Sequence, residues 1–121
     1  MQTVRSDTDT IHTSDDGRYT VRVVKRQRTK PLPEGARYVG RPTALGSRIK
    51  PKDRSEEERA NIIAAFTAEF ADEGSWCPKR ADRMAELLAE LREEGELTLA
   101  CWCAPKACHA DVLSGYLLTR A

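Results

Sequence analysis

The feature that most constrains the fold is a nearly all-apolar run at residues 97–103. It leads through a short proline-containing turn into an amphipathic helical pattern at residues 108–119. An apolar run without polar alternation is typical of a central strand that is buried in a sheet. The order strand, turn and helix predicts an α/β domain.

Other patterns supply the remaining elements. Residues 18–25 alternate between apolar and polar side chains and predict a strand, and residues 36–40 predict a second, shorter one. Helical patterns begin at Ser55, which forms a capping box with Glu58, and again near Pro78. We therefore expect a small two-layer or three-layer α/β domain with three helices and a short, mainly parallel sheet of about three to four strands.

The N-terminal segment, residues 1–17, is rich in Asp, Thr and Ser and lacks apolar periodicity. We expect a flexible arm here, in which His12 is incidental, followed by a single domain at residues 18–121. The segment has no apolar stretch of the kind found in secretory signals, and no run in the chain approaches the roughly 20 apolar residues that span a bilayer. The expectation is a cytoplasmic protein without a membrane partner.

Charge is divided unevenly along the chain. Residues 18–54 hold twelve Lys and Arg against two acidic residues, whereas residues 55–121 hold seven Lys and Arg against thirteen acidic ones. A basic segment this dense indicates an anionic partner, either nucleic acid or a phosphorylated small molecule. A solvated basic face beside acidic helices is the alternative that the composition leaves open.

The chemistry is expected where the apolar strand meets the last helix, because three of the four cysteines and one of the two histidines lie there within nine residues. Cys101 and Cys103 share one face of the strand, and Trp102 lies on the other, where we expect it in the core. Cys108 and His109 open the helix. Helix N-termini bind anions and lower the pKa of a cysteine thiol, and open α/β sheets place ligand sites at the carboxyl ends of strands.

Three interpretations of this segment remain open. In the first, the cysteines are core residues, and Cys108 caps the helix together with Asp111. In the second, the cysteines and the histidine hold zinc or iron. The strand geometry places Cys101 and Cys103 roughly 6.5–7 Å apart at Cα, which disfavours two ligands at that spacing, so we expect no stoichiometric metal. In the third, the segment binds or acts on a ligand.

The segment also resembles a known family. Residues 99–113 read Leu-Ala-Cys-Trp-Cys-Ala-Pro, then Cys-His-Ala-Asp-Val-Leu after two residues, and are similar to the C-W-C-x-P-x-x-C-H-G-D-V-L signature of the domain-of-unknown-function family DUF 4326, found largely in phage and bacterial genomes. Residues 38–46 resemble the family's Y-x-G-R-P loop, although residues 47–49 depart from its Asn-Pro-Phe ending. A more distant likeness to the Rossmann-like family DUF 488 implies a parallel sheet. The first family is uncharacterised, so the resemblance implies no reaction.

The two similar blocks would make a composite site if they met at one crevice. Gly40 would let the backbone approach a ligand, and Arg41 would hold a phosphate or carboxylate. This convergence requires the strand that ends near Gly40 to run parallel to residues 97–103, so that Arg41 and His109 meet at the carboxyl ends of both strands.

In such a site Cys108 would act as nucleophile or thiolate ligand and His109 as acid or base, and Cys101, Cys103 and Asp111 would contact the ligand. We therefore expect a domain that binds, or binds and acts on, an anionic, nucleotide-like small molecule. The alternatives are a non-catalytic module that binds nucleic acid or a host protein through residues 18–54, and a zinc- or iron-binding module. The sequence names no cofactor, substrate, reaction or oligomeric state.

Overall fold

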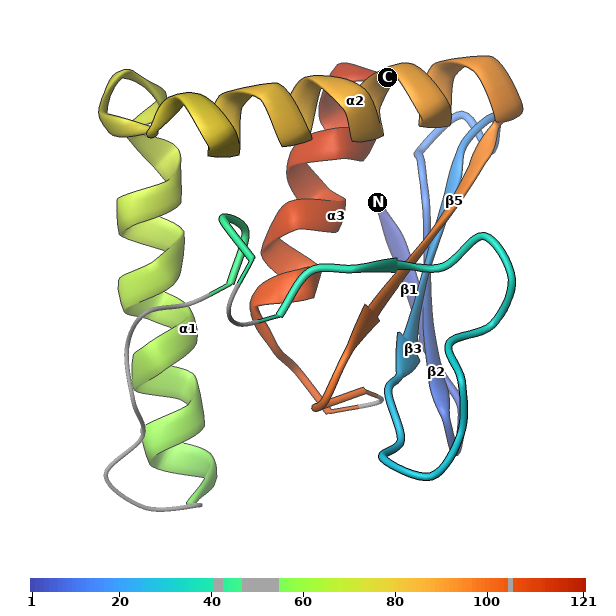
Figure 1. Cartoon of the computed structure of the whole chain (residues 1–121), viewed down its shortest axis with the longest axis vertical. Coiled ribbons are helices and arrows are strands. Elements are labelled where there is room, and N and C mark those ends of the chain that lie inside the picture. The colour runs from blue at the N-terminus through green and yellow to red at the C-terminus, as the bar shows by residue number, and fades with distance from the viewer. Residues whose placement is uncertain (41–42, 47–54, 105) are drawn as a thin grey trace.

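The computed structural model describes residues 1–40, 43–46, 55–104 and 106–121, and within them it shows a five-stranded sheet with three α-helices (Figure 1). The spatial order is β1-β2-β3-β5-β4 for β1 (Gln2–Arg5), β2 (Asp9–Thr13), β3 (Thr20–Lys25), β4 (Arg37–Tyr38) and β5 (Glu96–Cys101). The helices are α1 (Glu56–Ala71), α2 (Pro78–Glu94) and α3 (His109–Arg120), with a short 3-10 helix, η1 (Glu73–Ser75), between the first two. The α/β fold class is confirmed.

The sheet is mixed rather than mainly parallel, and it has more strands than expected. Both β3 and β4 pair parallel with β5, whereas β1 pairs antiparallel with β2 and β2 with β3. The additional strands come from residues 1–17, where we expected a flexible arm. These strands carry few large apolar side chains, so they lack the alternation that marks a half-buried strand. Pairing stabilises them instead: β2 pairs with the well-patterned β3, and β1 pairs with β2.

The helices lie on one face of the sheet (Figure 1). On β3, Val21 and Val23 are buried while Arg22 between them is exposed. The parallel register sets these valines beside Leu97 and Leu99 of β5, so one continuous apolar surface faces the helices. The core side chains that the helices contribute to it are Phe66, Phe70, Met84, Leu87, Leu91, Leu113 and Leu117.

The helix ends follow local chemistry. The Ser55 hydroxyl accepts a hydrogen bond from the Glu58 N–H at 3.1 Å, which caps α1. Pro78 occupies the first turn of α2, and Gly95 ends that helix in the left-handed conformation, with φ of 78°. The helix α1 ends at Ala71, and η1 begins two residues later.

Because β3, β4 and β5 are parallel, their carboxyl ends lie at the same edge of the sheet. The register sets Lys25, the last residue of β3, beside Cys101, the last residue of β5, and Tyr38 of β4 beside Ala100. The backbone N–H of Val39 also donates to the Ala100 carbonyl at 3.0 Å. The segments that follow β3, β4 and β5 therefore leave the sheet together at this carboxyl edge.

No helix in the described part of the chain combines the length and the apolar character that crossing a membrane requires.

The placement of residues 1–17 in the sheet can be tested by hydrogen exchange. The backbone amides of β2 should exchange at least about a hundredfold more slowly than those of the loop at residues 26–34, because β2 lies between two strands and opens only when the sheet opens. Mass spectrometry of peptides from both segments measures the ratio. Equal exchange rates would indicate that residues 1–17 form a flexible arm after all.

Candidate functional site

Three thiols meet at the carboxyl end of β5. Cys101 is buried at the end of the strand, and its Sγ lies 3.3 Å from the Sγ of Cys108. Cys108 is the N-cap residue of α3 and is 4 % exposed. Cys103, in the turn between them, is half-buried and also interacts with the Cys108 thiol. Cys77 is exposed at the start of α2, outside this cluster.

The thiols of this cluster differ in pKa. A hydrogen bond with the Cys108 thiol, together with Arg59 and the charge of His109, lowers the pKa of Cys103 to about 5 against the opposing effect of burial. The pKa of Cys108 is raised, because its interactions with Cys101 and Cys103 and its burial all favour the protonated thiol. Cys103 is therefore a thiolate at neutral pH, and Cys108 is the thiol that stabilises it.

The cation beside this thiolate is Arg59 of α1, which reaches across to the turn after β5. Its Nη1 donates to the Ala107 carbonyl at 3.4 Å, and its Nε is buried without a hydrogen-bond partner in the part of the chain that the structure describes. The nearest carboxylate oxygen, Glu56 Oε2, is 3.9 Å from Nε. Sequence reasoning missed Arg59. The available signal was that it is the one basic residue in a helix whose other charged residues are acidic.

His109 joins the end of β4 to the start of α3. Its Nε2–H donates to the Val39 carbonyl at 2.8 Å, and its ring packs edge-on against Phe66 of α1, with centroids 5.5 Å apart. Four elements, β4, β5, α1 and α3, therefore meet around this imidazole and the adjacent thiols. The expected parallel alignment of β4 with β5 is confirmed, and it is this alignment that brings Val39 to His109.

A cation and two aromatic rings border the site. Trp102 is 45 % exposed rather than in the core, and its Nε1–H donates to the Tyr38 hydroxyl at 3.0 Å. The Arg26 guanidinium lies 4.4 Å from the Tyr38 ring centroid and 5.5 Å from that of Trp102. Gly40 is buried against Tyr38, and a Cβ at Gly40 would come within 2.5 Å of the Tyr38 hydroxyl oxygen. The Tyr38 ring can fold back here because residue 40 has no side chain.

Asp111 secures the start of α3. Its Oδ2 accepts from the Cys108 N–H at 3.1 Å and from Arg5 Nη2 at 3.2 Å. Its Oδ1 accepts from His12 Nε2 at 2.8 Å, and His12 Nδ1 lies 2.9 Å from Thr3 Oγ1. His12, which we had interpreted as incidental, is 1 % exposed and ties β2 to the helix. The capping partnership of Cys108 with Asp111 is therefore present.

The structure thus brings together Gly40, Cys101, Cys103, Cys108 and His109. Asp111 belongs to the same helix start but is held by side chains from β1 and β2. Arg41, the expected anion clamp, lies outside the described residues. In the described ranges no group of three or more His, Cys, Asp or Glu side chains is arranged to hold a metal, and the metal-free state stays a prediction.

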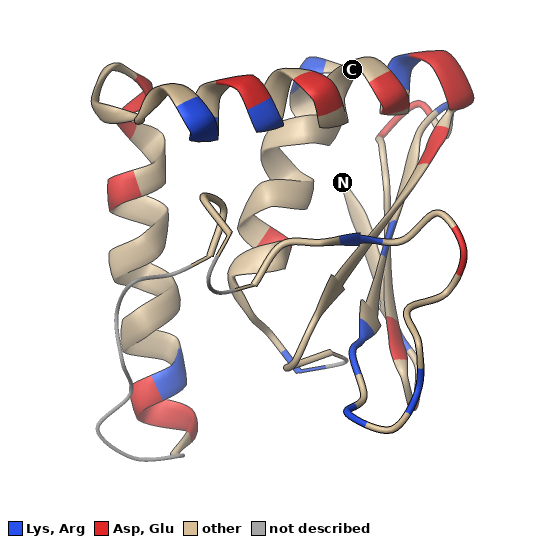
Figure 2. Ribbon diagram, in the orientation of Figure 1, with Lys and Arg blue, Asp and Glu red and all other residues tan. Residues whose placement is uncertain are grey.

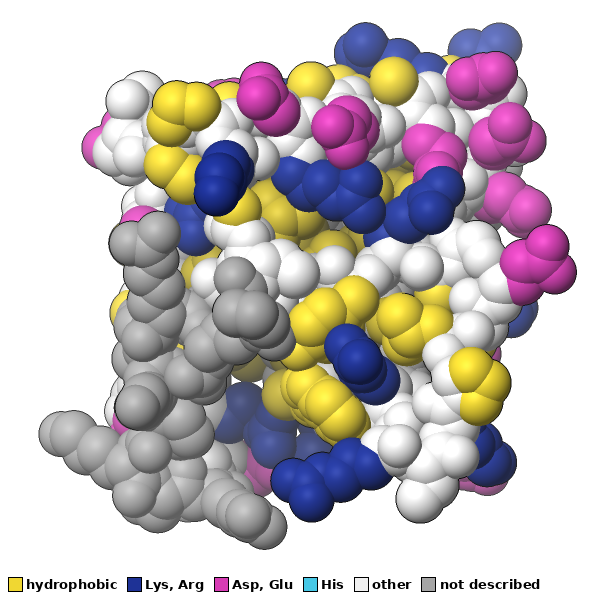
Figure 3. Space-filling model, in the orientation of Figure 1, with side chains coloured by type: hydrophobic (Ala, Val, Ile, Leu, Met, Phe, Trp, Pro, Cys, Tyr) yellow, Lys and Arg dark blue, Asp and Glu magenta, His cyan; other side chains and the backbone are white. Residues whose placement is uncertain are grey.

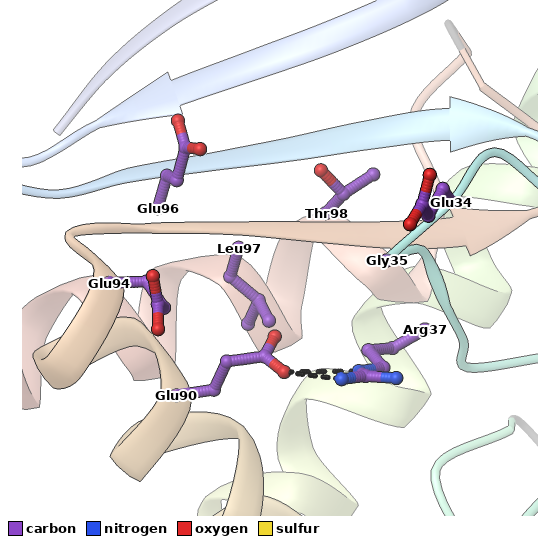
Figure 4. Close-up of a pocket in the computed structure, with 8 residues that line it drawn as sticks. All are labelled: Glu34, Gly35, Arg37, Glu90, Glu94, Glu96, Leu97 and Thr98. Carbon is purple, nitrogen blue, oxygen red and sulfur yellow. Dashed lines mark hydrogen bonds and ion pairs between the residues drawn. The ribbon is translucent and has the colours of Figure 1, made fainter.

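Charge is polarised along the sheet (Figure 2). Basic residues gather on the loops at the carboxyl edge, where Lys25, Arg28, Lys30 and Lys106 are all exposed. Acidic residues gather at the end of α2 and the amino end of β5, and a second group opens α1 beside Arg59. A hollow of about 350 Å³ at that amino end is lined by glutamates, with Arg37 paired to Glu90 at 2.7 Å (Figure 4). The acidic lining of this hollow disfavours an anion there.

Comparison with known proteins gives one match. A family model described as a domain of unknown function (DUF4326) matches residues 23–118, which include both the end of β4 and the cysteine-histidine segment. No curated protein and no solved structure matches the chain.

The ionisation of Cys103 predicts a distinct pH profile for alkylation. Iodoacetamide should modify Cys103 faster than the buried Cys101 and Cys108, at a rate that levels off above about pH 6 because the thiolate is then fully formed. A thiol with an ordinary pKa near 8.5 gains about tenfold in rate per pH unit over the same range. Peptide mass spectrometry measures each rate. A Cys103 rate that climbs steadily to pH 8 would contradict this assignment.

The Asp111 network predicts a pH-dependent stability. Burial raises the pKa of Asp111, but hydrogen bonds from His12 and Cys108 and the charge of Arg5 together lower it below its ordinary value. Its stabilisation is therefore fully present above about pH 4, the ordinary aspartate pKa, and is lost as the pH falls through the lower folded-state value.

The substitution Asp111→Asn should thus lower the free energy of unfolding by about 1–3 kcal/mol at pH 7 and by progressively less below pH 4. Urea denaturation at several pH values measures the difference. The matched control is Asp82→Asn on the exposed face of α2, which should have little effect. An Asp111→Asn effect as large at pH 2.5 as at pH 7 would count against the network.

Proposed function

The chain belongs to the DUF4326 family of domains of unknown function, and from the geometry at its carboxyl edge we propose that it binds an anionic, nucleotide-like small molecule there. The observation that carries the proposal is the approach of the Arg59 guanidinium to the start of α3, beside His109 and the Cys103 thiolate. A guanidinium and a helix N-terminus both favour a phosphate or carboxylate.

The surroundings support the same ligand class. The loops after β3 and β5 carry exposed cations at this edge, and the acidic residues nearest to it are Glu56, Glu57 and Glu58 in the first turn of α1, next to Arg59 (Figure 2). The loop cations attract anionic ligands before contact. The Arg59 Nε, which is buried without a hydrogen-bond partner among the described residues, would gain one from a bound anion.

If the domain acts on its ligand, we propose that Cys103 rather than Cys108 is the nucleophile. The Cys103 thiolate is half-buried at the edge of the site, whereas Cys108 is buried and remains protonated. Cys108 then acts as hydrogen-bond donor to the thiolate, and His109 lies close enough to lower the Cys103 pKa by its charge. This arrangement suits attack on an electrophilic carbon or phosphorus centre.

A second candidate, nucleic-acid binding, is favoured by one observation. Lys25, Arg28 and Lys30 are exposed along the end of β3 and the loop that follows it. Binding through these cations would weaken steeply with salt as counterions are released from the phosphates.

Calorimetric titration with AMP, and with adenosine as the uncharged comparison, tests the proposal. AMP should bind at least about tenfold more tightly than adenosine, and Arg59→Gln should weaken AMP binding about ten- to a hundredfold through loss of a charge-assisted contact. Arg83→Gln on α2 is the matched control, because it removes an arginine that pairs with Glu86 on the same helix.

Equal affinities for AMP and adenosine, or equal effects of the two arginine substitutions, would refute the anion site. Oligonucleotide binding with a steep salt dependence, together with no detectable AMP binding, would favour the second candidate.

A further inference from the structure

An exposed tryptophan at the carboxyl edge is unexplained by the anion site. Trp102 is 45 % exposed, and the other large apolar side chains exposed in the described ranges are Met1 and Val4 of the edge segment at β1. Figure 3 shows hydrophobic side chains gathered on this face of the molecule, with a Lys or Arg side chain lying across them. An exposed aromatic surface of this kind marks a contact site more often than chance exposure does.

The exposed ring is held in a fixed orientation. The Trp102 Nε1–H donates to the Tyr38 hydroxyl at 3.0 Å, and the Arg26 guanidinium lies over both rings. Gly40 leaves the space into which the Tyr38 ring folds. Trp102, Tyr38 and Arg26, which we call the ring platform, come from the ends of three neighbouring strands. Because their positions are set before any ligand arrives, a ring that stacks here loses little additional side-chain entropy in the protein.

Two residues of the ring platform are neighbours in the chain of residues that belong to the anion site. Trp102 lies between Cys101 and Cys103 in the chain, and Tyr38 precedes Val39, whose carbonyl accepts from His109. The side chains of Trp102 and Cys103 are successive along the chain, with Cα atoms about 3.8 Å apart. Side chains of successive strand residues lie on opposite faces, and the register sets Tyr38 beside Ala100, so the platform lies on the face of the sheet away from the helices. A ligand with its ring on the platform would reach Arg59 and the start of α3 around the carboxyl edge of the sheet.

We propose that the ring platform binds the base of the nucleotide whose anionic group occupies the adjacent site, with the base stacked on Trp102. This inference rests on the proposed function and assigns to it the recognition of a planar ring. A single exposed aromatic ring among the described residues suits one base, whereas non-specific single-strand binding uses several aromatic side chains for successive bases. The Arg26 guanidinium adds a cation beside the stacked ring.

The test separates the base from the phosphate by comparing AMP with ribose 5-phosphate. In the full chain carrying Trp76→Phe, Trp102 is the one remaining tryptophan, so its fluorescence reports on the platform. AMP should change that fluorescence and bind about ten- to a hundredfold more tightly than ribose 5-phosphate. By calorimetry, Trp102→Leu should reduce AMP affinity to the level of ribose 5-phosphate and leave ribose 5-phosphate binding unchanged.

Two variants distinguish stacking from a structural role of the tryptophan. Trp102→Phe keeps a ring but loses the hydrogen bond to Tyr38, and it should retain most of the preference for AMP. Val4→Ser, at an exposed apolar position on β1, should leave both affinities unchanged.

Equal binding of AMP and ribose 5-phosphate, with no effect of Trp102→Leu, would overturn the platform while leaving the anion site standing. Absence of binding by either ligand would overturn the proposed function and the platform with it. An adenylate oligonucleotide that binds through Trp102 when AMP does not would replace the mononucleotide with a nucleic-acid strand.

Discussion

The parallel pairing of β5 with both β3 and β4 is the constraint on which the rest of the structure depends. It aligns the carboxyl ends of three strands, so the turn after β5, the end of β4 and the loop after β3 all leave the sheet at one edge. The hydrogen bond from His109 to the Val39 carbonyl exists because of this alignment. An antiparallel β4 would have brought its opposite end to this edge and separated Val39 from His109. The chemistry of the cysteine-histidine segment is thus a consequence of backbone pairing.

At the carboxyl end of β5, the Cys108 thiol interacts with both other thiols. Cys108 is buried and its pKa is raised, and the same hydrogen bond lowers the pKa of Cys103. Arg59 adds a positive charge to the same side. The hydrogen bonds of Asp111 to the Cys108 N–H and to His12 of β2 meanwhile fix the start of α3. The structural and chemical interpretations of the segment are therefore compatible, because the residue that caps α3 also sets the state of the neighbouring thiol.

Much of the fold could be predicted from local patterns, and the failures have physical causes. The apolar run of β5, the Ser55 cap and the stop at Gly95 are signals carried within a few residues. The strands β1 and β2 are stabilised by partners elsewhere in the chain, so their own sequence did not reveal them, and with them the role of His12 was missed. The sequence singled out the cysteine-histidine segment, whose thiols the structure places together, but it placed Trp102 in the core, where the structure does not. Arg59 was missed because its contact to Ala107 spans 48 positions, and no local pattern reports such a distance.

The central claim, that an anion binds at the carboxyl edge between α1 and the start of α3, is tested most directly by mapping amide chemical shifts during titration with AMP. The largest changes should cluster at Val39 and Gly40 and at residues 106–109, and Arg59→Gln should move their midpoint to an AMP concentration about ten- to a hundredfold higher. Changes centred on the acidic hollow near Glu90, or confined to the loop at residues 26–34 and insensitive to Arg59→Gln, would contradict the central claim.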